Sequence, residues 1–277
     1  MTRQLDLDLD LALAVAAATE AADHALWLST RGFRTWDKGD MNPVTSSDLE
    51  IDQLLKERLL TARPGYGWLS EETADSPDRL EREALWVVDP IDGTRDYVRG
   101  RDGWAVSVAL VAGGQVLLGV LAAPALARTY VATASGATLN GAPIAVSGRT
   151  EEEGARLPID PGFATAKLWP EPWRVEAVAK PNSIALRMAL VASGEADGLI
   201  DGRLTNEWDV AAASIIVEAA GGRVTDRHGA PFGFNKPDPD CIGIVAATPA
   251  LHDRLTWRLA TARDALRRAG ITLQRDA

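Results

Sequence analysis

The spacing of apolar residues predicts two helices at the start of the chain. Between residues 5 and 28, apolar side chains return every three or four positions, which is typical of an amphipathic helix. The same spacing continues from Ile51 to Leu59, so we expect a second helix to open at residues 44–48. Glycine and proline interrupt residues 31–43, which we expect to form a mobile loop between the two helices.

Short runs rich in β-branched residues follow, and they predict strands. Residues 86–92 begin as a continuous apolar run, which indicates a buried strand. Residues 104–111 alternate, and Gly113–Gly114 then favours a tight turn into a second strand of a hairpin. The remaining expected strands are residues 66–69, 116–122, 130–132 and 137–139. This part of the chain therefore predicts two helices packed on an antiparallel sheet.

The pattern changes after about residue 146. Residues 147–173 have weak periodicity and are expected to form a linker and loops. Helices and short strands then alternate, which predicts an α/β half. The expected helices are residues 183–193, 210–220 and 249–269, and the expected strands are residues 198–200, 223–225 and 241–247. We therefore divide the chain into an N-terminal α+β half, residues 1–145, and a C-terminal α/β half, residues 146–277.

Composition and charge narrow the class of partner. The chain has 277 residues, 46% hydrophobic and 25% charged, which is ordinary for a globular protein with a large core. A net charge of −10 argues against a nucleic-acid polymer or an anionic membrane as the main partner. We see no signal peptide and no apolar run of transmembrane length. The single cysteine, Cys241, is compatible with a reducing cytoplasm, which is the expected location.

The stretch from Trp86 to Asp96 carries the strongest chemical signal. A strand ends in Asp89 and Asp92, and Gly93 and Thr94 then open a helix that Asp92 is expected to cap. The amides at a helix N-terminus attract phosphate, whereas two carboxylates repel it unless divalent cations lie between them. Oxygen ligands of this kind suit Mg²⁺. The stretch therefore predicts a metal–phosphate site, although a solvated Asp-Pro turn is the plain alternative.

Three further acidic residues lie where the chain leaves a regular element. Glu71 follows a strand, and Asp48 and Asp209 lie at the starts of helices. Taken separately, each is most often a helix cap or a solvated carboxylate. The three histidines are scattered and lack zinc-type pairing. No Ser/His or Cys/His arrangement suggests a covalent nucleophile, so these residues favour attack by water.

Together these motifs resemble the inositol monophosphatase family of lithium-sensitive, magnesium-dependent phosphatases. The resemblance rests on Ser70–Glu72, Asp89–Thr94, Trp208–Ala212 and Glu218–Gly222, in this order and spacing. It covers essentially the whole chain. It implies the layered α-β-α-β-α sandwich of the inositol monophosphatase and fructose-1,6-bisphosphatase type, with the site between the two halves. It also implies a phosphoric monoester hydrolase.

The resemblance assigns roles to particular residues. Two to three Mg²⁺ ions per site are implied, held by Glu71, Asp89, the Ile91 carbonyl, Asp92 and Asp209. Thr94, hydrogen-bonded toward Asp48, is implied to orient a metal-activated water for in-line attack, with Glu71 near a third ion. The phosphate and substrate contacts implied are Gly93, Thr94, Ser183, Asp209 and, on the loop, Lys38. Asp96, inside the predicted helical turn, is expected to be solvated.

The substrate is less clearly indicated. Inositol-specific members carry Gly at the position of Asn182 and Glu at the position of Gly202. The Glu207-Trp208-Asp209 triplet instead looks like the 3′(2′),5′-bisphosphate nucleotidases. We therefore expect a phosphomonoesterase of the inositol monophosphatase type acting on a small phosphorylated metabolite. A nucleotidase acting on adenosine 3′,5′-bisphosphate is the alternative, and a catalytically silent phosphate or metal binder is a weaker one. The family also implies a homodimer.

Overall fold

The computed structural model describes residues 5–37, 39, 43–164, 169, 171 and 173–268. We call residues 5–145 the N-terminal half and residues 146–268 the C-terminal half, following the division predicted above. The helices of the N-terminal half are α1 (Leu7–Ser29), α2 (Ser46–Ala62), η1 (Pro77–Glu81), α3 (Thr94–Val98) and η2 (Pro124–Leu126). Its strands are β1 (Thr35–Asp37), β2 (Pro43–Thr45), β3 (Gly67–Ser70), β4 (Leu85–Asp92), β5 (Ala105–Ala112), β6 (Gln115–Ala123), β7 (Arg128–Thr133), β8 (Gly136–Leu139) and β9 (Ala142–Pro143).

The C-terminal half alternates helices with short strands, as the sequence predicts. Its helices are α4 (Ile184–Ala192), α5 (Glu207–Ala219) and α6 (Pro249–Arg268). Its strands are β10 (Arg156–Leu157), β11 (Glu176–Ala177), β12 (Gly198–Asn206), β13 (Arg223–Thr225) and β14 (Asp240–Ala247).

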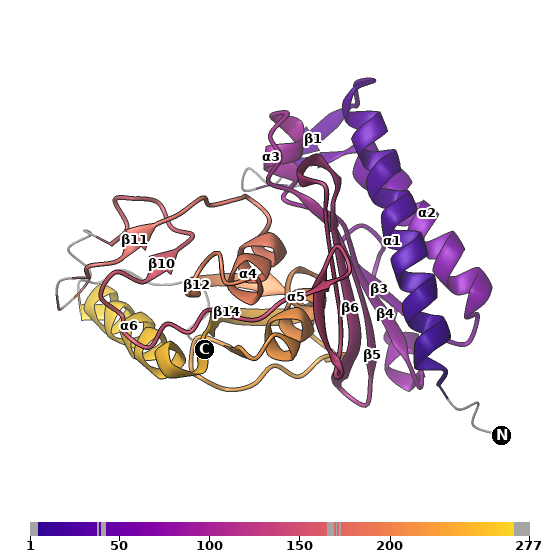
Figure 1. Cartoon of the computed structure of the whole chain (residues 1–277). Helices are drawn as coiled ribbons and strands as arrows, with labels where there is room; N and C mark the ends of the chain where they lie inside the picture. Colours follow the sequence, from indigo (N-terminus) through magenta and orange to yellow (C-terminus); the bar gives the residue numbers. More distant parts are fainter. Residues whose placement is uncertain are drawn as a thin grey trace.

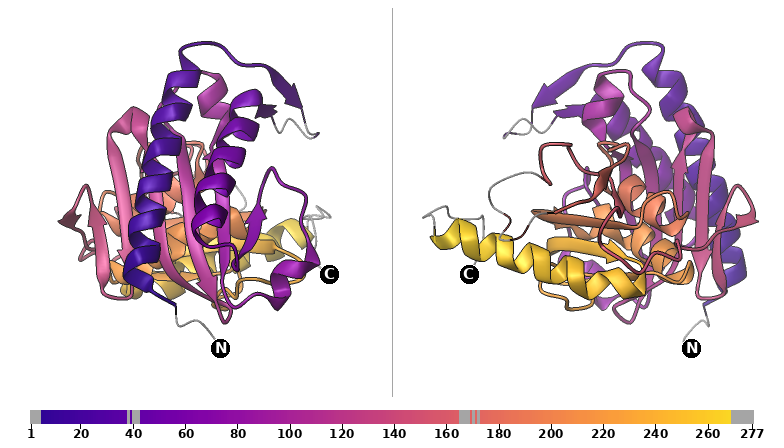
Figure 2. Two further views of the ribbon diagram at one scale, coloured as in Figure 1. Left: turned by 90° about the vertical axis from the view of Figure 1, so that its right-hand side faces the viewer. Right: turned by 60° about the vertical axis from the view of Figure 1, so that its left-hand side comes forward.

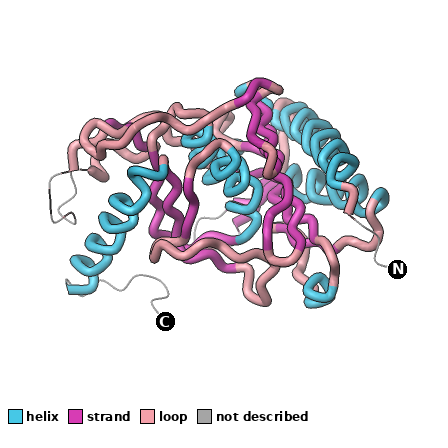
Figure 3. Tube along the Cα trace, turned by 60° about the horizontal axis from the view of Figure 1, so that its bottom comes forward, coloured by secondary structure: helices cyan, strands magenta, loops and turns pink. Residues whose placement is uncertain are grey.

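The elements stack in five layers, α-β-α-β-α (Figure 1). Helices α1 and α2 cover one face of a seven-stranded sheet, and α5 and α4 cover the other. The three-stranded sheet β12-β14-β13 packs on α4 and α5 and carries α6 on its outer side. Figures 2 and 3 show the same order of helical and sheet layers from other directions. The layered fold expected from the sequence is confirmed.

The large sheet has the strand order β3-β4-β5-β6-β7-β8-β9. Strands β3 and β4 are parallel, and every other neighbouring pair is antiparallel. The expectation of a purely antiparallel sheet is therefore wrong at one edge. The residues that link β3 to β4 include η1, and this crossover lets the second strand run in the same direction as the first.

The sheet is buried on both faces, which explains the continuous apolar run of β4. Trp86 and Val88 belong to the core beneath α1 and α2, whereas Val87 belongs to the core beneath α4 and α5. Successive side chains of a strand point to opposite faces, so residues 85–88 of β4 are apolar on both faces of the sheet. By length and composition α1 could cross a membrane, but its alanine-rich face is buried against α2 and the sheet. Helix α1 therefore packs on the sheet through one face, and its residues Leu9 and Trp27 remain exposed.

Local interactions move several predicted boundaries. Residues expected to be loop form a hairpin, because β1 pairs with β2 in an antiparallel register. Strand β12 continues to Asn206, well beyond the expected residue 200, since its antiparallel pairing with β14 resumes after a bulge. Helix α5 begins at Glu207 rather than Val210, because Asn206 and Asp209 form a capping box ahead of the apolar residues.

Gly119 of β6 allows α5 to lie directly on the large sheet. A Cβ atom at this position would lie 2.5 Å from the carbonyl oxygen of Ala212 and 2.7 Å from Ile215 Cγ2. Both of these atoms belong to α5, and the helix backbone cannot move away without disturbing the cores on its two sides. The close contact between the two halves therefore depends on a missing side chain.

We expect Gly119→Ala to destabilise the protein by about 1–3 kcal/mol, because the added methyl overpacks the contact between β6 and α5. Urea unfolding measures this change. Gly148→Ala is the matched control, because a Cβ atom there has nothing within 4 Å. Equal stability of the two variants would contradict the described packing.

Candidate active site

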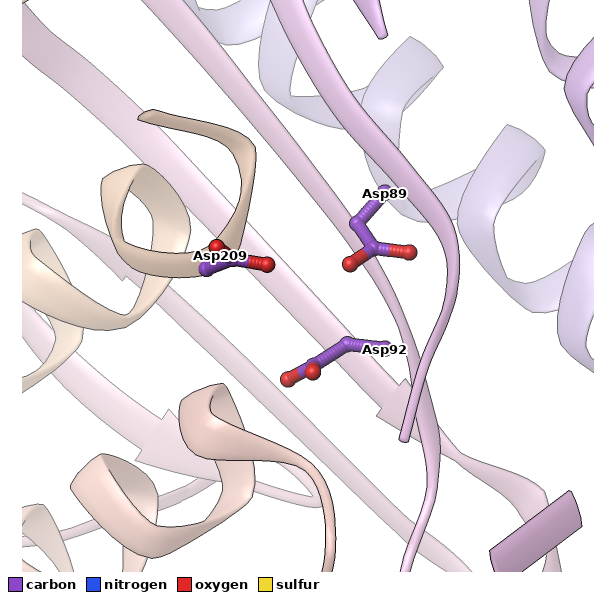
Figure 4. A group of neighbouring side chains, drawn as sticks. All are labelled: Asp89, Asp92 and Asp209. Carbon is purple, nitrogen blue, oxygen red and sulfur yellow. The ribbon is translucent and has the colours of Figure 1, made fainter. Parts of the chain in front are cut away.

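The site begins at a bulge in β4. In a regular strand, two residues three positions apart point to opposite faces, so Asp89 and Asp92 would be separated by the sheet. The pairing of β4 with β5 shifts register between these two residues. This irregularity brings both carboxylates to the face covered by α4 and α5. The carboxylate of Asp209, from the first turn of α5, points at them from the opposite half (Figure 4).

Oxygen atoms of Asp89, Asp92 and Asp209 all lie within 4.8 Å of one another. Asp89 and Asp92 are buried and Asp209 is partly buried. Burial raises the pKa of Asp89 well above its ordinary value, and the charges of Glu71 and Asp92 raise that pKa further. Burial and the neighbouring charges of Asp92 and Glu71 also raise the pKa of Asp209. Four carboxylates from both halves therefore repel one another at this point.

Asp92 differs from the other two because helix α4 stabilises its charge. Its carboxylate accepts hydrogen bonds from Ser183 Oγ, from the amide of Ala185 at 2.8 Å and from the amide of Ile184 at 3.3 Å. These bonds oppose the rise that burial causes in the pKa of Asp92. The expectation that Asp92 caps the next helix of its own half is wrong, because Gly93 is the N-cap of α3. Asp92 instead caps a helix of the other half.

Gly93 fills a position that no other residue could occupy without strain. Its φ of +95° is left-handed, and a Cβ atom would lie 2.7 Å from the Gly103 carbonyl oxygen and 2.8 Å from the Ser183 amide nitrogen. The Ser183 amide itself donates to Gly103 O at 2.9 Å. The start of α4 is thereby held directly against the start of α3.

A second set of hydrogen bonds links Thr94 to α2. The Thr94 hydroxyl lies 3.2 Å from Asp48 Oδ1 and 3.0 Å from the Ile91 carbonyl oxygen. The other oxygen of Asp48 accepts from the amide and the hydroxyl of Thr45, which caps α2. Burial raises the pKa of Asp48 to about 6. The structure thus places the Thr94 hydroxyl within hydrogen-bond distance of Asp48, as the resemblance implies, and also of the Ile91 carbonyl.

Asp96 is not solvated, contrary to expectation. It is only 8% exposed, and its Oδ2 accepts the amide proton of Asn182 at 2.9 Å. Helical spacing placed Asp96 on an open turn, but the segment before α4 covers it. This carboxylate therefore holds the other half of the chain in place beside Gly93.

The remaining predicted residues are placed as follows. Glu71 follows β3, is partly buried, and donates its amide proton to Val88 O at 3.4 Å. Ser183 is fully buried, and its oxygen accepts from Leu186 N while its proton goes to Asp92. Lys38 lies outside the described residues. Sequence patterns gave no signal for the contacts of Asp96 or for those of Asp92 with α4, because they join segments far apart in the chain.

An open cavity of about 650 Å³ lies beside the β1–β2 pair and α3. The residues that line it are Thr35, Trp36, Asp37, Pro43, Arg95, Val98, Arg99 and Asn182. Arg95 directly follows Thr94, and Asn182 directly precedes Ser183, so two lining residues are sequence neighbours of residues described above. Trp36 is 43% exposed. The lining of the cavity therefore includes an aromatic ring, two arginine side chains and the carboxylate of Asp37.

Comparisons with known proteins agree with this geometry. The sequence profile of the inositol monophosphatase family matches residues 6–265. A histidinol-phosphatase of Mycobacterium tuberculosis is 34% identical over 241 residues, 80% of this chain and 86% of its own. The 3′(2′),5′-bisphosphate nucleotidase CysQ of Aggregatibacter actinomycetemcomitans is 30% identical over 233 residues, 79% and 85% of the two chains. A solved structure of an IMPase of Thermotoga maritima superimposes with a TM-score of 0.79 at 28% identity, over 94% of this chain and 98% of that one.

The layered fold and the acidic site at the end of β4 define a metal-dependent phosphatase. The chain belongs to the inositol monophosphatase family and is a phosphoric monoester hydrolase. The family resemblance and the phosphomonoesterase activity expected from the sequence are confirmed.

In chelator at pH 7.5, we expect Asp89→Asn to be more stable than the wild type. The substitution removes one buried charge from a group of like charges, and asparagine can still accept the hydrogen bond that Ile91 N donates to Asp89 at 3.0 Å. The gain is about 1 kcal/mol, or roughly 2–4 °C in Tm. Thermal melting of both proteins measures it.

The gain should depend on pH in a defined direction. The pKa of Asp89 is raised in the folded protein, so the folded state binds this proton more tightly than the unfolded chain. The wild type therefore loses stability as the pH rises above about 3.9, the pKa of an aspartate in the unfolded chain. The difference in Tm between Asp89→Asn and the wild type should widen above that pH. A variant that melts below the wild type at pH 7.5 would show that Asp89 is structural.

Proposed function

We propose that the protein hydrolyses a phosphate monoester of a small metabolite with Mg²⁺ bound at Asp89, Asp92 and Asp209. The observation that carries the proposal is the convergence of these carboxylates, from both halves, within 4.8 Å. Glu71 and the Ile91 carbonyl complete the proposed ligand set, for two to three ions per site. The donors are all hard oxygen atoms, which is the chemistry that Mg²⁺ prefers. Neutralising buried like charges is also the strongest reason for a cation to bind here.

When bound, Mg²⁺ would lower the pKa of a water molecule and neutralise charge on the phosphate. The residues of the chain would position the attacking water and the phosphate. Thr94 donates toward Asp48 or Ile91 O, so its oxygen is left to accept a hydrogen bond from the attacking water. The amides of Gly93 and Thr94, at the start of α3, would bind phosphate oxygens. The Gly93 backbone can approach the phosphate closely because it has no side chain.

The inositol monophosphatase type is the first candidate for the substrate class, since the family profile spans nearly the whole chain. The cavity beside Arg95 and Arg99 favours a second candidate, a 3′,5′-bisphosphate nucleotide. Trp36 could stack on a base, and guanidinium groups bind phosphate oxygens in pairs. The relatives named above act, by name, on histidinol phosphate and on bisphosphate nucleotides. A panel of inositol 1-phosphate, histidinol phosphate and adenosine 3′,5′-bisphosphate, read by phosphate release, decides among them.

We further propose a cytoplasmic homodimer that lithium inhibits, and a boundary between the halves near residue 145. The dimer and the lithium effect rest on the family resemblance, the cytoplasmic location on the single cysteine, and the boundary on the change of sequence pattern after about residue 146. Light scattering on a sizing column tests the dimer, and phosphate release in LiCl against KCl tests the lithium effect.

Phosphate release should require Mg²⁺ and should be inhibited by Ca²⁺, because Ca²⁺ takes longer bonds and more ligands.

Asp89→Asn should lower kcat on the order of 10²-fold or more, since one anionic ligand is lost. Asp102→Asn is the matched control, because Asp102 is exposed on the loop after α3. Full activity in excess chelator, or equal mild effects of the two substitutions, would contradict the metal assignment.

Arg99→Gln should raise KM for adenosine 3′,5′-bisphosphate about tenfold and leave KM for inositol 1-phosphate unchanged, if a second phosphate binds in the cavity. Arg58→Gln is the control, because this arginine pairs with Glu20 on the distant face formed by α1 and α2. Equal changes of KM for the two substrates would place the nucleotide elsewhere.

A further inference from the structure

A buried arginine joins the two halves through a loop that contacts the first turn of α5. Arg79, in η1 of the N-terminal half, is only 3% exposed. Within its own half, its guanidinium binds both oxygens of Asp75, at 2.7 and 2.9 Å. Across the junction it donates to Asn235 Oδ1 and to the Lys236 carbonyl oxygen, each at 2.8 Å. One side chain therefore fixes a loop that follows it by more than 150 residues in sequence.

The loop that Arg79 holds binds Glu207 in turn. The amide of Asn235 donates to Glu207 Oε2 at 2.7 Å, and the amide of Lys236 donates to Glu207 Oε1 at 3.0 Å. Glu207 is fully buried, so its carboxylate depends on these two amides and on the Lys236 ammonium at 3.9 Å. Asn235 has a left-handed φ of +58°, which directs successive amides toward one carboxylate.

Glu207 is the first residue of α5, and Asp209 is the third. The Glu207 amide donates to the Pro239 carbonyl at 2.9 Å, and the Asn206 amide donates to Asp209 Oδ2 at 2.6 Å. The first turn of α5 is thus held by its backbone and by the Glu207 side chain. The loop at residues 235–236 is therefore linked by hydrogen bonds to the helical turn that carries Asp209.

We propose that Arg79 is a positioning residue for metal binding: through residues 235–236 and Glu207, it sets the position of Asp209 relative to Asp89 and Asp92. The inference rests on the proposed function. A positioning role explains why a charged side chain is buried at the junction. An apolar contact would hold the halves together without the desolvation free energy that burying a charge costs. The planar fork of arginine binds Asp75 and the loop at once, which a lysine ammonium cannot do.

The test is direct measurement of Mg²⁺ affinity by titration calorimetry, with Tm recorded in chelator for each protein. Arg79→Met should bind Mg²⁺ about 10- to 100-fold more weakly than the wild type, as for other residues that orient metal ligands. Arg79→Lys should be weakened nearly as much. The matched control is Arg58→Met, which removes an exposed Arg–Glu pair far from the junction and should leave affinity unchanged.

Glu207→Gln should also weaken Mg²⁺ binding. Glutamine replaces one carboxylate oxygen, which accepts a proton from a backbone amide, with an NH₂ group that cannot accept it. The double variant Arg79→Met with Glu207→Gln should show less than the sum of the two effects in free energy, because both act through one loop. Additive effects would mean that Arg79 does not act through Glu207, and would overturn the proposed route.

A milder variant covers the case in which Arg79→Met does not fold. Asn235→Gly is compatible with the left-handed backbone and removes the side-chain amide whose oxygen Arg79 Nη1 binds, while the Arg79 bonds to Asp75 and to the Lys236 carbonyl oxygen can remain. It should also weaken Mg²⁺ binding. Wild-type affinity in the folded Arg79 or Asn235 variants, with a lower Tm, would make Arg79 a purely structural contact and overturn the inference. A wild type that binds no Mg²⁺ would instead overturn the proposed function on which the inference rests.

Discussion

Electrostatic repulsion among Asp89, Asp92 and Asp209 is the constraint on which the rest of the structure depends. These carboxylates come from both halves and meet where little water can screen them. Each is held by a different device: Asp89 and Asp92 by the bulge in β4, Asp92 also by the first amides of α4, and Asp209 by the capping box of α5. The repulsion among these carboxylates therefore lowers the stability of the folded protein, and a bound cation would reduce that repulsion.

The junction between the halves is built to resist this repulsion. Gly119 allows α5 to lie on the sheet without an intervening side chain, and Gly93 allows α4 to begin directly against α3. Asp96 binds the segment before α4, and Arg79 binds the loop beside α5. Both polar contacts cross from one half to the other.

Patterns local in sequence predicted much of this molecule. Apolar spacing gave α1, α2 and the β5–β6 hairpin, and the motifs around Asp89 and Trp208 gave the family and its phosphatase activity. What escaped prediction is non-local. The bond of Asp92 to α4, the burial of Asp96 and the extension of β12 along β14 depend on partners distant in sequence. The spacing of Asp89 and Asp92 even suggests opposite faces, and only the bulge in β4 brings them together.

Anomalous diffraction from crystals soaked in Mn²⁺ tests the central claim most directly, because Mn²⁺ takes the same oxygen ligands as Mg²⁺ and is seen without assuming a mechanism. The account predicts a strong peak within coordination distance of carboxylate oxygens of Asp89, Asp92 and Asp209, and a further peak beside Glu71. A map with no peak among these carboxylates, in crystals that take up Mn²⁺ elsewhere, would contradict it.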